Sequence, residues 1–315
     1  MSLVRLDKAY CLQLANGHGW NLIATEGTEP WVDRLASIME LKPCEVNGYP
    51  KLIFTREELS KEKYEEPVYA LDPDIRRFLP GDGWKTNNYA SADPISNIQF
   101  WYHNSVPDAI CYIGRDEYHD NDENEDKDAI KMWSSVYFIY HWEQHSGGLP
   151  FHAGLVERNG RSVLLSANGG TGKSTCCRRI PSPWHALADD QTLIVRDEQG
   201  KYMVHPFPTW SEYLWRTAAR TWNVERHVSL SAIFFIQRAK SDEVIPIKQG
   251  KAAILINESA MQACAVGQLN LNKEDQTSLR TRIFSNSCEL AKAIPAYILR
   301  VSLNGRFWEE IEKVL

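Results

Sequence analysis

The chain has 315 residues, of which 43% are hydrophobic and 24% are charged, and its formal net charge is −6. These values are typical of a globular protein with one large domain, or with a core domain and a smaller appendage. The negative charge argues against nucleic acid as a general partner, and no apolar run approaches the roughly 18–20 residues that span a bilayer. We therefore expect neither nucleic acid nor a membrane as a partner.

The seven cysteines form no Cys-x-x-Cys pair and no regular framework. This usage predicts free thiols in a reducing compartment. The first residues lack the apolar region of a signal peptide, so we expect a cytoplasmic location. The neighbours Cys176 and Cys177 could form a redox pair, although small packing residues on a helix are the simpler interpretation.

The first 115 residues contain short alternating segments separated by Gly and Pro, which predict strands of a β-rich or mixed α+β appendage. An acidic run over 116–128 predicts a linker or the start of a helix. Apolar residues at helical spacing then predict an amphipathic helix over about 127–145. The expected organisation is an appendage over 1–115, with substrate recognition as one role, the acidic linker, and a main domain over 129–315. The predicted strands cover 9–14, 19–24, 51–55, 97–102 and 109–113.

Residues 151–167 predict a β-hairpin that leads into a glycine-rich loop. The Asn-Gly pair at 159–160 lies between two β-like runs and favours a two-residue type I′ turn. Such a turn puts His152 opposite Ala167 on the neighbouring strand. The hairpin would therefore bring a histidine to the start of the loop.

The stretch ANGGTGKS over 167–174 has the form of a phosphate-binding loop, with Ala167 where the usual pattern begins with Gly. A predicted strand precedes it and a short helix over 174–180 follows, which is the context that the motif requires. In such a loop backbone N–H groups point at phosphate oxygens, the lysine reaches the β- and γ-phosphates, and the serine hydroxyl binds Mg²⁺. We therefore expect ATP and Mg²⁺ as cofactors. The predicted nucleotide-binding residues are Ala167, Asn168, Gly169, Gly170, Thr171, Gly172, Lys173, Ser174 and Thr175, with Ser174 also a metal ligand.

Asp189 and Asp190 follow a short apolar strand predicted over 184–188 and would lie beside the loop. Two adjacent carboxylates suit a division of labour, in which one holds Mg²⁺ and the other accepts the proton of an attacking hydroxyl. We favour Asp189 as the base and Asp190 as the metal partner. With His152 and Lys173 they make up the expected catalytic residues.

A further positively charged side chain is expected near the transferred phosphate, where it would stabilise the charge of the transition state. The candidates are Arg178, Arg216 and Arg220.

The helical segments 255–263 and 289–295 look like core-packing pieces without catalytic residues.

The stretch over 152–175, followed by Leu-Ala-Asp-Asp at 187–190, resembles the catalytic domain of HPr kinase/phosphorylase. That domain has a histidine ahead of its loop at like spacing and an Ala-Asp-Asp motif after it. The segments 205–211, 231–236 and 304–311 resemble the ScmC-type proteins of the SynChlorMet cassette, which are HPr-kinase-like proteins found beside radical-SAM enzymes and a small PqqD-like protein.

The resemblance implies a mixed α/β (α+β) fold with an HPr-kinase-like P-loop core. His152 would lie near the transferred phosphate, and Asp189 and Asp190 would form the catalytic acid pair. Family members with known activity phosphorylate a serine on a protein, and related kinases in peptide-biosynthesis clusters phosphorylate a precursor peptide. We therefore expect an ATP-dependent kinase that acts on a Ser/Thr hydroxyl of a peptide or protein, with a precursor peptide as the substrate.

Two departures from HPr kinases limit this expectation. Thr175 stands where those enzymes have an acidic residue, and their Leu-Glu-Val-Arg-Gly-Leu-Gly signature has no match. Both departures argue against phosphorylase activity and against HPr itself as the substrate.

Two other functions are alternatives: an ATPase that couples hydrolysis to the handling of a peptide, and a non-catalytic module that binds a precursor peptide. The presence of Lys173 and Ser174 together with the acid pair argues against the second, because a vestigial site has no reason to keep its phosphate and metal ligands together. A small-molecule acceptor and a homo-oligomer are both left open.

Overall fold

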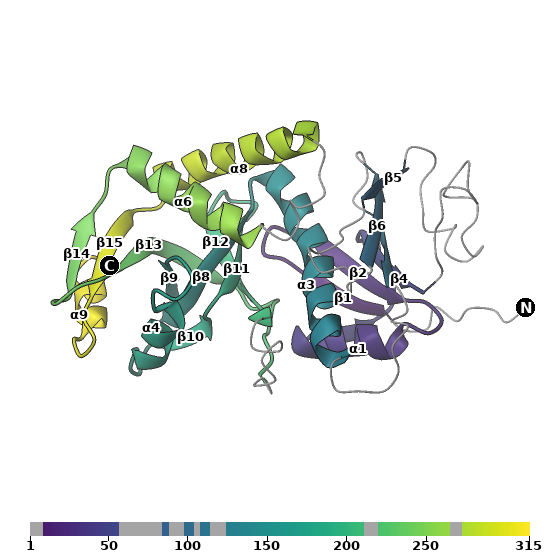
Figure 1. The fold of residues 1–315 in the computed structure, drawn as a ribbon, viewed down its shortest axis with the longest axis horizontal. Helices are drawn as coiled ribbons and strands as arrows, with labels where there is room; N and C mark the ends of the chain where they lie inside the picture. The colour runs from purple at the N-terminus through teal and green to yellow at the C-terminus, as the bar shows by residue number, and fades with distance from the viewer. Residues whose placement is uncertain are drawn as a thin grey trace, which may run out of the picture.

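The computed structural model describes residues 9–56, 84–87, 98–103, 108–113, 124–210, 220–264 and 273–315. In this part of the chain two mixed β-sheets lie side by side (Figure 1). Helix α3 (Asn124–Glu143) lies between them and contacts strands of both sheets. The expected mixed α/β fold is confirmed at this level.

The first sheet has seven strands and is built from the N-terminal part of the chain. Its strands β2, β4 and β7 pair in parallel, and the other pairs are antiparallel. The five strands predicted here are confirmed as β1, β2, β4, β6 and β7. In sheet order the strands are β3 (Lys42–Cys44), β1 (Ala9–Gln13), β2 (Gly19–Ala24), β4 (Lys51–Thr55), β7 (Ala109–Ile113), β6 (Ile98–His103) and β5 (Trp84–Asn87).

Helix α1 (Glu29–Ile38) packs against this sheet and is not among the predicted elements. Pro30 lies in its first turn, where a missing N–H costs no hydrogen bond. Its apolar residues recur at helical spacing and are buried, which is the pattern of a helix that covers a sheet. These residues are Trp31, Val32, Leu35 and Ile38.

The second sheet has eight strands and contains the hairpin and the glycine loop. Five of its strands close a ring, because β8 pairs with β11, β11 with β12, β12 with β13, β13 with β9, and β9 again with β8. The strands are β8 (Leu149–Arg158), β9 (Arg161–Ser166), β10 (His185–Ala188), β11 (Gln191–Arg196), β12 (Tyr202–Phe207), β13 (Val228–Arg238), β14 (Glu243–Pro246) and β15 (Ala296–Val301).

Helices cover both faces of the second sheet (Figure 1). Helices α6 (Gln249–Ala263) and α8 (Lys273–Ala293) bury their apolar residues in one core, which also takes in side chains of the first sheet and of α3. Helices α4 (Lys173–Arg179) and α9 (Phe307–Glu312) contribute to a smaller core on the opposite face. The site described below therefore lies on a sheet held from both sides.

Helix α3 begins at Asn124, inside the acidic segment predicted as a linker, and a short 3₁₀ turn over Gln144–Ser146 follows its end. The helix predicted over about 127–145 is thus confirmed. None of the helices in the described ranges is both long and apolar enough to cross a membrane.

The two sheets are joined by specific contacts as well as by a shared core. The Trp222 backbone N–H donates to the Ile38 carbonyl at 2.8 Å. The buried Glu143 carboxylate accepts a hydrogen bond from the Asn16 amide at 2.7 Å and lies 3.0 Å from Nδ1 of His18. The N-terminal sheet is therefore attached at two places: at the end of α3, through Glu143, and at the segment that precedes β13, through Trp222.

The prediction of free thiols was wrong for two cysteines, because Cys11 and Cys44 form a disulfide. They are 33 residues apart and meet because β1 and β3 are neighbours at the edge of the first sheet. Spacing alone does not reveal that adjacency. The free cysteines among the described residues are Cys111, Cys176, Cys177, Cys264 and Cys288.

Candidate active site

The predicted hairpin is confirmed and delivers a histidine to the glycine loop. Strands β8 and β9 are antiparallel, and Ala153 pairs with Ser166, the last residue of β9. Asn159 and Gly160 both have positive φ, at 55° and 77°, as a type I′ turn requires. His152 therefore lies one residue beyond the last hairpin pair, beside the start of the loop.

The loop between β9 and α4 has the backbone of a tight, left-handed turn at two glycines. Gly170 has a φ of 72° and Gly172 a φ of 122°, which side chains rarely allow. A side-chain carbon added at Gly169, Gly170 or Gly172 would meet no atom within 4 Å. The loop is therefore not covered at these three glycines, and helix α4 begins directly after it at Lys173.

Three of the predicted catalytic side chains converge at this loop. The Lys173 Nζ lies 2.8 Å from His152 Nε2 and donates to the Ala167 carbonyl at 3.0 Å. The same His152 nitrogen lies 2.8 Å from Asp190 Oδ1, which is 3.7 Å from Lys173 Nζ. An ammonium, an imidazole and a carboxylate thus share one small volume.

Burial and charge shift the proton affinities of two of these groups. Burial lowers the pKa of Lys173 from its ordinary value of 10.5, and the nearby Asp190 charge offsets this in part. Burial alone would raise the pKa of Asp190, but the hydrogen bond with His152 and the positive charges of His152 and Lys173 outweigh it, so the net pKa is lowered from 3.8. Asp190 is therefore an ionised carboxylate at neutral pH.

Asp189 is buried beside the cluster but has a different set of partners. Its Oδ1 accepts a hydrogen bond from the Thr209 hydroxyl at 2.6 Å and lies 3.7 Å from the Arg220 guanidinium. The two neighbouring acids thus face different groups: Asp190 faces His152 and Lys173, and Asp189 faces Thr209 and Arg220.

Gly154 allows helix α4 to pack closely on the hairpin. A Cβ at this position of β8 would collide with Sγ of Cys177 on α4 and would lie 3.6 Å from the Cα of Asp189. The Cys177 thiol also donates to the Ala188 carbonyl at 3.8 Å, directly before the acid pair. The absence of a side chain at 154 therefore lets the loop helix and the acids approach each other.

Burial raises the pKa of Cys176 to about 11 and that of Cys177 to about 12. Both thiols stay protonated at neutral pH and belong to the smaller core. This supports the packing interpretation over a redox pair.

The three candidate arginines differ in their placement. Arg220 lies beside Asp189, as described above. Arg178 is exposed on α4, and Arg216 lies outside the described residues. Of the loop residues, Ser174 is half-buried at the start of α4 and Thr175 is exposed.

A family model for the SynChlorMet cassette protein ScmC matches residues 117–315, which is more than half of the chain. The chain belongs to the ScmC family. No curated protein matches it. The match covers helix α3, the whole second sheet and every residue of the converging cluster.

In this ScmC family member, helix α6 contributes two site residues from a segment that looked like core packing alone. Gln262 Oε1 lies 2.7 Å from His152 Nδ1, and Gln262 Nε2 donates to Asn168 Oδ1 at 2.8 Å. The Ser259 hydroxyl donates to the His152 carbonyl at 3.1 Å. The segment was expected to be core packing without catalytic residues, and its contacts with His152 add to that expectation. Residues 262 and 152 are 110 positions apart, and only the fold brings them together.

Arg238, at the end of β13, is a further residue that the sequence did not indicate. Its guanidinium donates to the carbonyls of Gly170 and of Thr171, the latter at 3.1 Å. These contacts turn two loop carbonyls toward β13. The loop is thus held by Arg238 as well as by Lys173.

A pocket of about 220 Å³ lies between the loop, the end of β13 and helix α6. Its lining includes apolar side chains, amides and a carboxylate. The residues on its wall include Ser166, Asn168, Thr171, Phe235, Leu255, Glu258 and Gln262.

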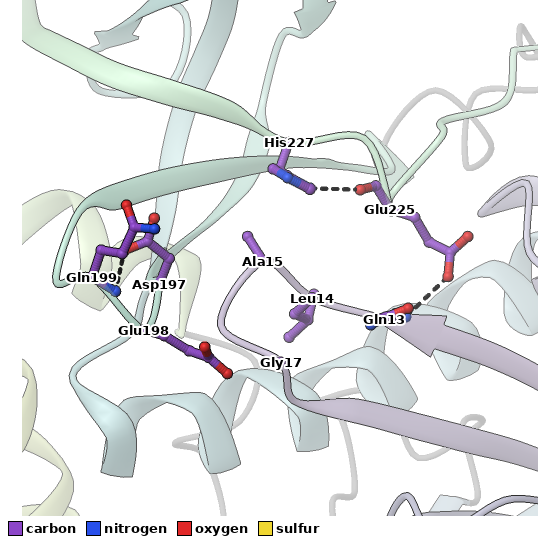
Figure 2. Close-up of a pocket in the computed structure, with 9 residues that line it drawn as sticks. All are labelled: Gln13, Leu14, Ala15, Gly17, Asp197, Glu198, Gln199, Glu225 and His227. Carbon is purple, nitrogen blue, oxygen red and sulfur yellow. Dashed lines mark hydrogen bonds between the residues drawn. The ribbon is translucent and has the colours of Figure 1, made fainter.

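A larger pocket of about 520 Å³ lies away from the glycine loop, where the first sheet meets the second (Figure 2). Within it the Gln13 N–H donates to Glu225 at 3.0 Å, and Asp197 accepts hydrogen bonds from backbone N–H groups of its own turn. None of the predicted site residues lines this pocket. Its residues are Gln13, Leu14, Ala15, Gly17, Asp197, Glu198, Gln199, Glu225 and His227.

Proposed function

We propose that this ScmC family member is an ATP-dependent kinase with an HPr-kinase-like P-loop core, which transfers the γ-phosphoryl group to a Ser/Thr hydroxyl of a peptide or protein. The observation that carries the proposal is the convergence of Lys173, His152 and Asp190 at the glycine loop. A loop that served only as a turn would need none of these three groups.

The loop residues 167–175 would hold the phosphates of ATP. The left-handed backbone at Gly170 and Gly172 supports this role, because such turns point successive N–H groups to one side. Lys173 is largely buried, and its Nζ donates to the Ala167 carbonyl of the loop at 3.0 Å, so it lies where it could reach bound phosphates. When a nucleotide binds, Lys173 would exchange its hydrogen bond to the neutral Ala167 carbonyl for one to a charged phosphate oxygen, which is a stronger acceptor.

The residues present fit Mg²⁺. This ion takes one or two carboxylates and fills its other positions with phosphate oxygens and water. Asp190, whose low pKa keeps it ionised, and the Ser174 hydroxyl would hold it. When bound, Mg²⁺ would neutralise charge on the β- and γ-phosphates.

The remaining groups have distinct roles in the proposed transfer. His152 would orient the γ-phosphoryl group through Nε2, the ring nitrogen that faces the loop. Asp189 would accept the proton of the attacking hydroxyl, and the hydrogen bond from the Thr209 hydroxyl would fix the position of its carboxylate. Positioning and charge neutralisation would supply most of the rate enhancement.

The family name supports a role in peptide biosynthesis, since it refers to a gene cassette. We therefore propose a precursor peptide of that cassette as the acceptor. With ATP as the donor, the cytoplasm is the proposed site of action.

The experiment combines the full chain, Mg²⁺, ATP labelled at the γ-phosphate and synthetic peptides from neighbouring small genes. Label on the peptide is the expected result, and Lys173→Ala should lower transfer by at least about 100-fold. Lys251→Ala, which removes an exposed lysine of α6, is the matched control and should keep full transfer. Release of phosphate to water with no labelled peptide would favour the ATPase. Equal nucleotide affinity in Lys173→Ala and in the unaltered protein would refute the assignment of the loop as the phosphate-binding site.

A further inference from the structure

Gln262 is the second-to-last residue of α6 and bridges two parts of the candidate site. Its side-chain oxygen lies 2.7 Å from His152 Nδ1, and its side-chain nitrogen donates to Asn168 Oδ1 at 2.8 Å. Both ends of the amide are therefore used. In the structure Asn168 accepts from the nitrogen, and the oxygen is the atom that faces the histidine.

The orientation of this amide determines where the histidine carries a proton. An amide oxygen can only accept a hydrogen bond, so Nδ1 of His152 must be the donor and must carry the hydrogen. The other ring nitrogen, Nε2, then faces the loop. It lies 2.8 Å from Lys173 Nζ and 2.8 Å from Asp190 Oδ1.

With Nδ1 protonated, the ring has two states that differ by one proton at Nε2. In the neutral ring the Nε2 lone pair accepts a hydrogen bond from the Lys173 ammonium. In the charged ring Nε2–H donates to the Asp190 carboxylate. Both states keep the hydrogen bond to Gln262, so the proton-binding atom is the one that faces the anion site.

Without Gln262 a third state becomes available to the neutral ring. Nε2 would carry the hydrogen and donate to Asp190, while Nδ1 would accept from water. Lys173 would then lose the acceptor that now lies 2.8 Å away. The exposed position of Gln262 means that water can reach Nδ1 once the amide is gone.

We propose that Gln262 is a positioning residue that holds His152 as the Nδ1–H tautomer, so that Nε2 serves the phosphate site. The tautomer part of this inference rests on geometry alone, and its effect on transfer rests on the proposed function. Gln262 would act through His152 and need not touch a nucleotide.

The test uses the full chain with ¹⁵N-labelled histidine, because the ¹⁵N shifts of the two ring nitrogens report which one carries the hydrogen. His152→Asn identifies the signals of residue 152 among the nine histidines. Gln262→Met keeps the side-chain length but removes both hydrogen bonds, and it should convert the neutral ring mainly to the Nε2–H form. Gln249→Met, at the first position of the same helix, is the matched control and should leave the Nδ1–H form unchanged.

Gln262→Glu separates the two hydrogen bonds, because a carboxylate can accept from Nδ1–H but cannot donate to Asn168. It should restore the Nδ1–H tautomer. An Nδ1–H ring in Gln262→Met would overturn the inference, whatever the activity of the protein.

Phosphate transfer provides the second readout. Gln262→Met should lower the transfer rate by about 10- to 100-fold with little change in Mg·ATP affinity, and Gln262→Glu should recover most of that loss. Transfer as slow in Gln262→Glu as in Gln262→Met, with the tautomer restored, would refute the catalytic part. An absence of transfer in the unaltered chain would refute the proposed kinase and leave the tautomer result intact.

Discussion

The Lys173 ammonium is 6% exposed, and burial makes its charge harder to keep than that of a surface lysine. A buried cation interacts strongly with an incoming phosphate, because little water screens the pair. The same burial means that the charge is lost at a lower pH than the ordinary value of 10.5. Binding strength and pH sensitivity therefore have one cause.

Nucleotide affinity should fall as the pH rises through the lowered pKa of Lys173, since the neutral amine cannot pair with phosphate. In Lys173→Arg this fall in nucleotide affinity should occur at a higher pH, because the pKa of a guanidinium is higher than that of an ammonium group. Titration of Mg·ATP binding against pH in both proteins measures this. Identical pH profiles in the two proteins would exclude Lys173 as the titrating group.

The two acids should respond differently to amide replacement. Asp189→Asn should keep Mg·ATP binding and lower transfer by about 10²- to 10⁴-fold, because it removes the proposed base. Asp190→Asn should instead raise the Mg²⁺ concentration needed for half-maximal activity by about 10- to 100-fold. Mg²⁺ titrations of both variants test the assignment, and the reverse pattern would exchange the two roles.

Among the secondary-structure elements, the packing of α4 on β8 depends on the absence of a side chain at Gly154. Gly154→Ala should destabilise the fold by about 1–3 kcal/mol, because the new Cβ collides with the Cys177 sulfur. Gly250→Ala, at a helical glycine with open space around it, should be neutral or stabilising by up to about 1 kcal/mol.

Chemical denaturation of the two glycine variants gives these free energies of unfolding. The collision can be tested further by adding Cys177→Ala to Gly154→Ala, which removes the sulfur. The double variant should lose less stability than the two single changes added together. If the losses of stability in the two single variants simply add, the Cys177 sulfur is not the atom that excludes a side chain at position 154.

The hairpin could be predicted because its determinants are local. The Asn-Gly turn fixes the register of β8 and β9, and that register alone brings His152 to the loop. The contact between Gln262 and His152 could not be predicted, because it depends on how α6 lies across the second sheet. The Cys11–Cys44 disulfide was missed for the same reason, since it needs the order of β3, β1 and β2 in the first sheet.

For the molecule as a whole, the described parts of the two sheets share one apolar core. Trp20 from the first sheet, Tyr140 from α3 and Phe207 from the second sheet all belong to it and are nearly inaccessible to water. The residues matched by the family model thus pack against residues that precede the match. Cleavage between the two sheets would expose apolar surface on both pieces.

The contact between His18 and Glu143 should make the stability of the packing between the two sheets depend on pH. The hydrogen bond with Glu143 raises the pKa of His18 above 6.5, although burial opposes it. A raised pKa means that the stabilisation is fully present below 6.5 and is lost as the pH rises through the higher value in the folded chain.

The difference in unfolding free energy between the unaltered chain and His18→Gln should therefore shrink as the pH increases from about 6 to 8. His18 is 39% exposed, so the effect is screened by solvent. In a Glu143→Gln background the same replacement should show no such pH dependence. A difference that stays constant with pH would exclude this ion pair as its source.

The closed ring of strands has a consequence for how an extended peptide could meet this protein. A strand inside a ring has neighbours on both sides, so within the described residues β9 and β11 leave little free edge for a guest strand. In the part of the chain that the structure describes, the sheet ends at β10 and β14, and at the β10 margin Arg220 donates to the Leu187 carbonyl at 3.5 Å. Strand β10 runs directly into Asp189, so this is the margin of the sheet that ends at the acid pair.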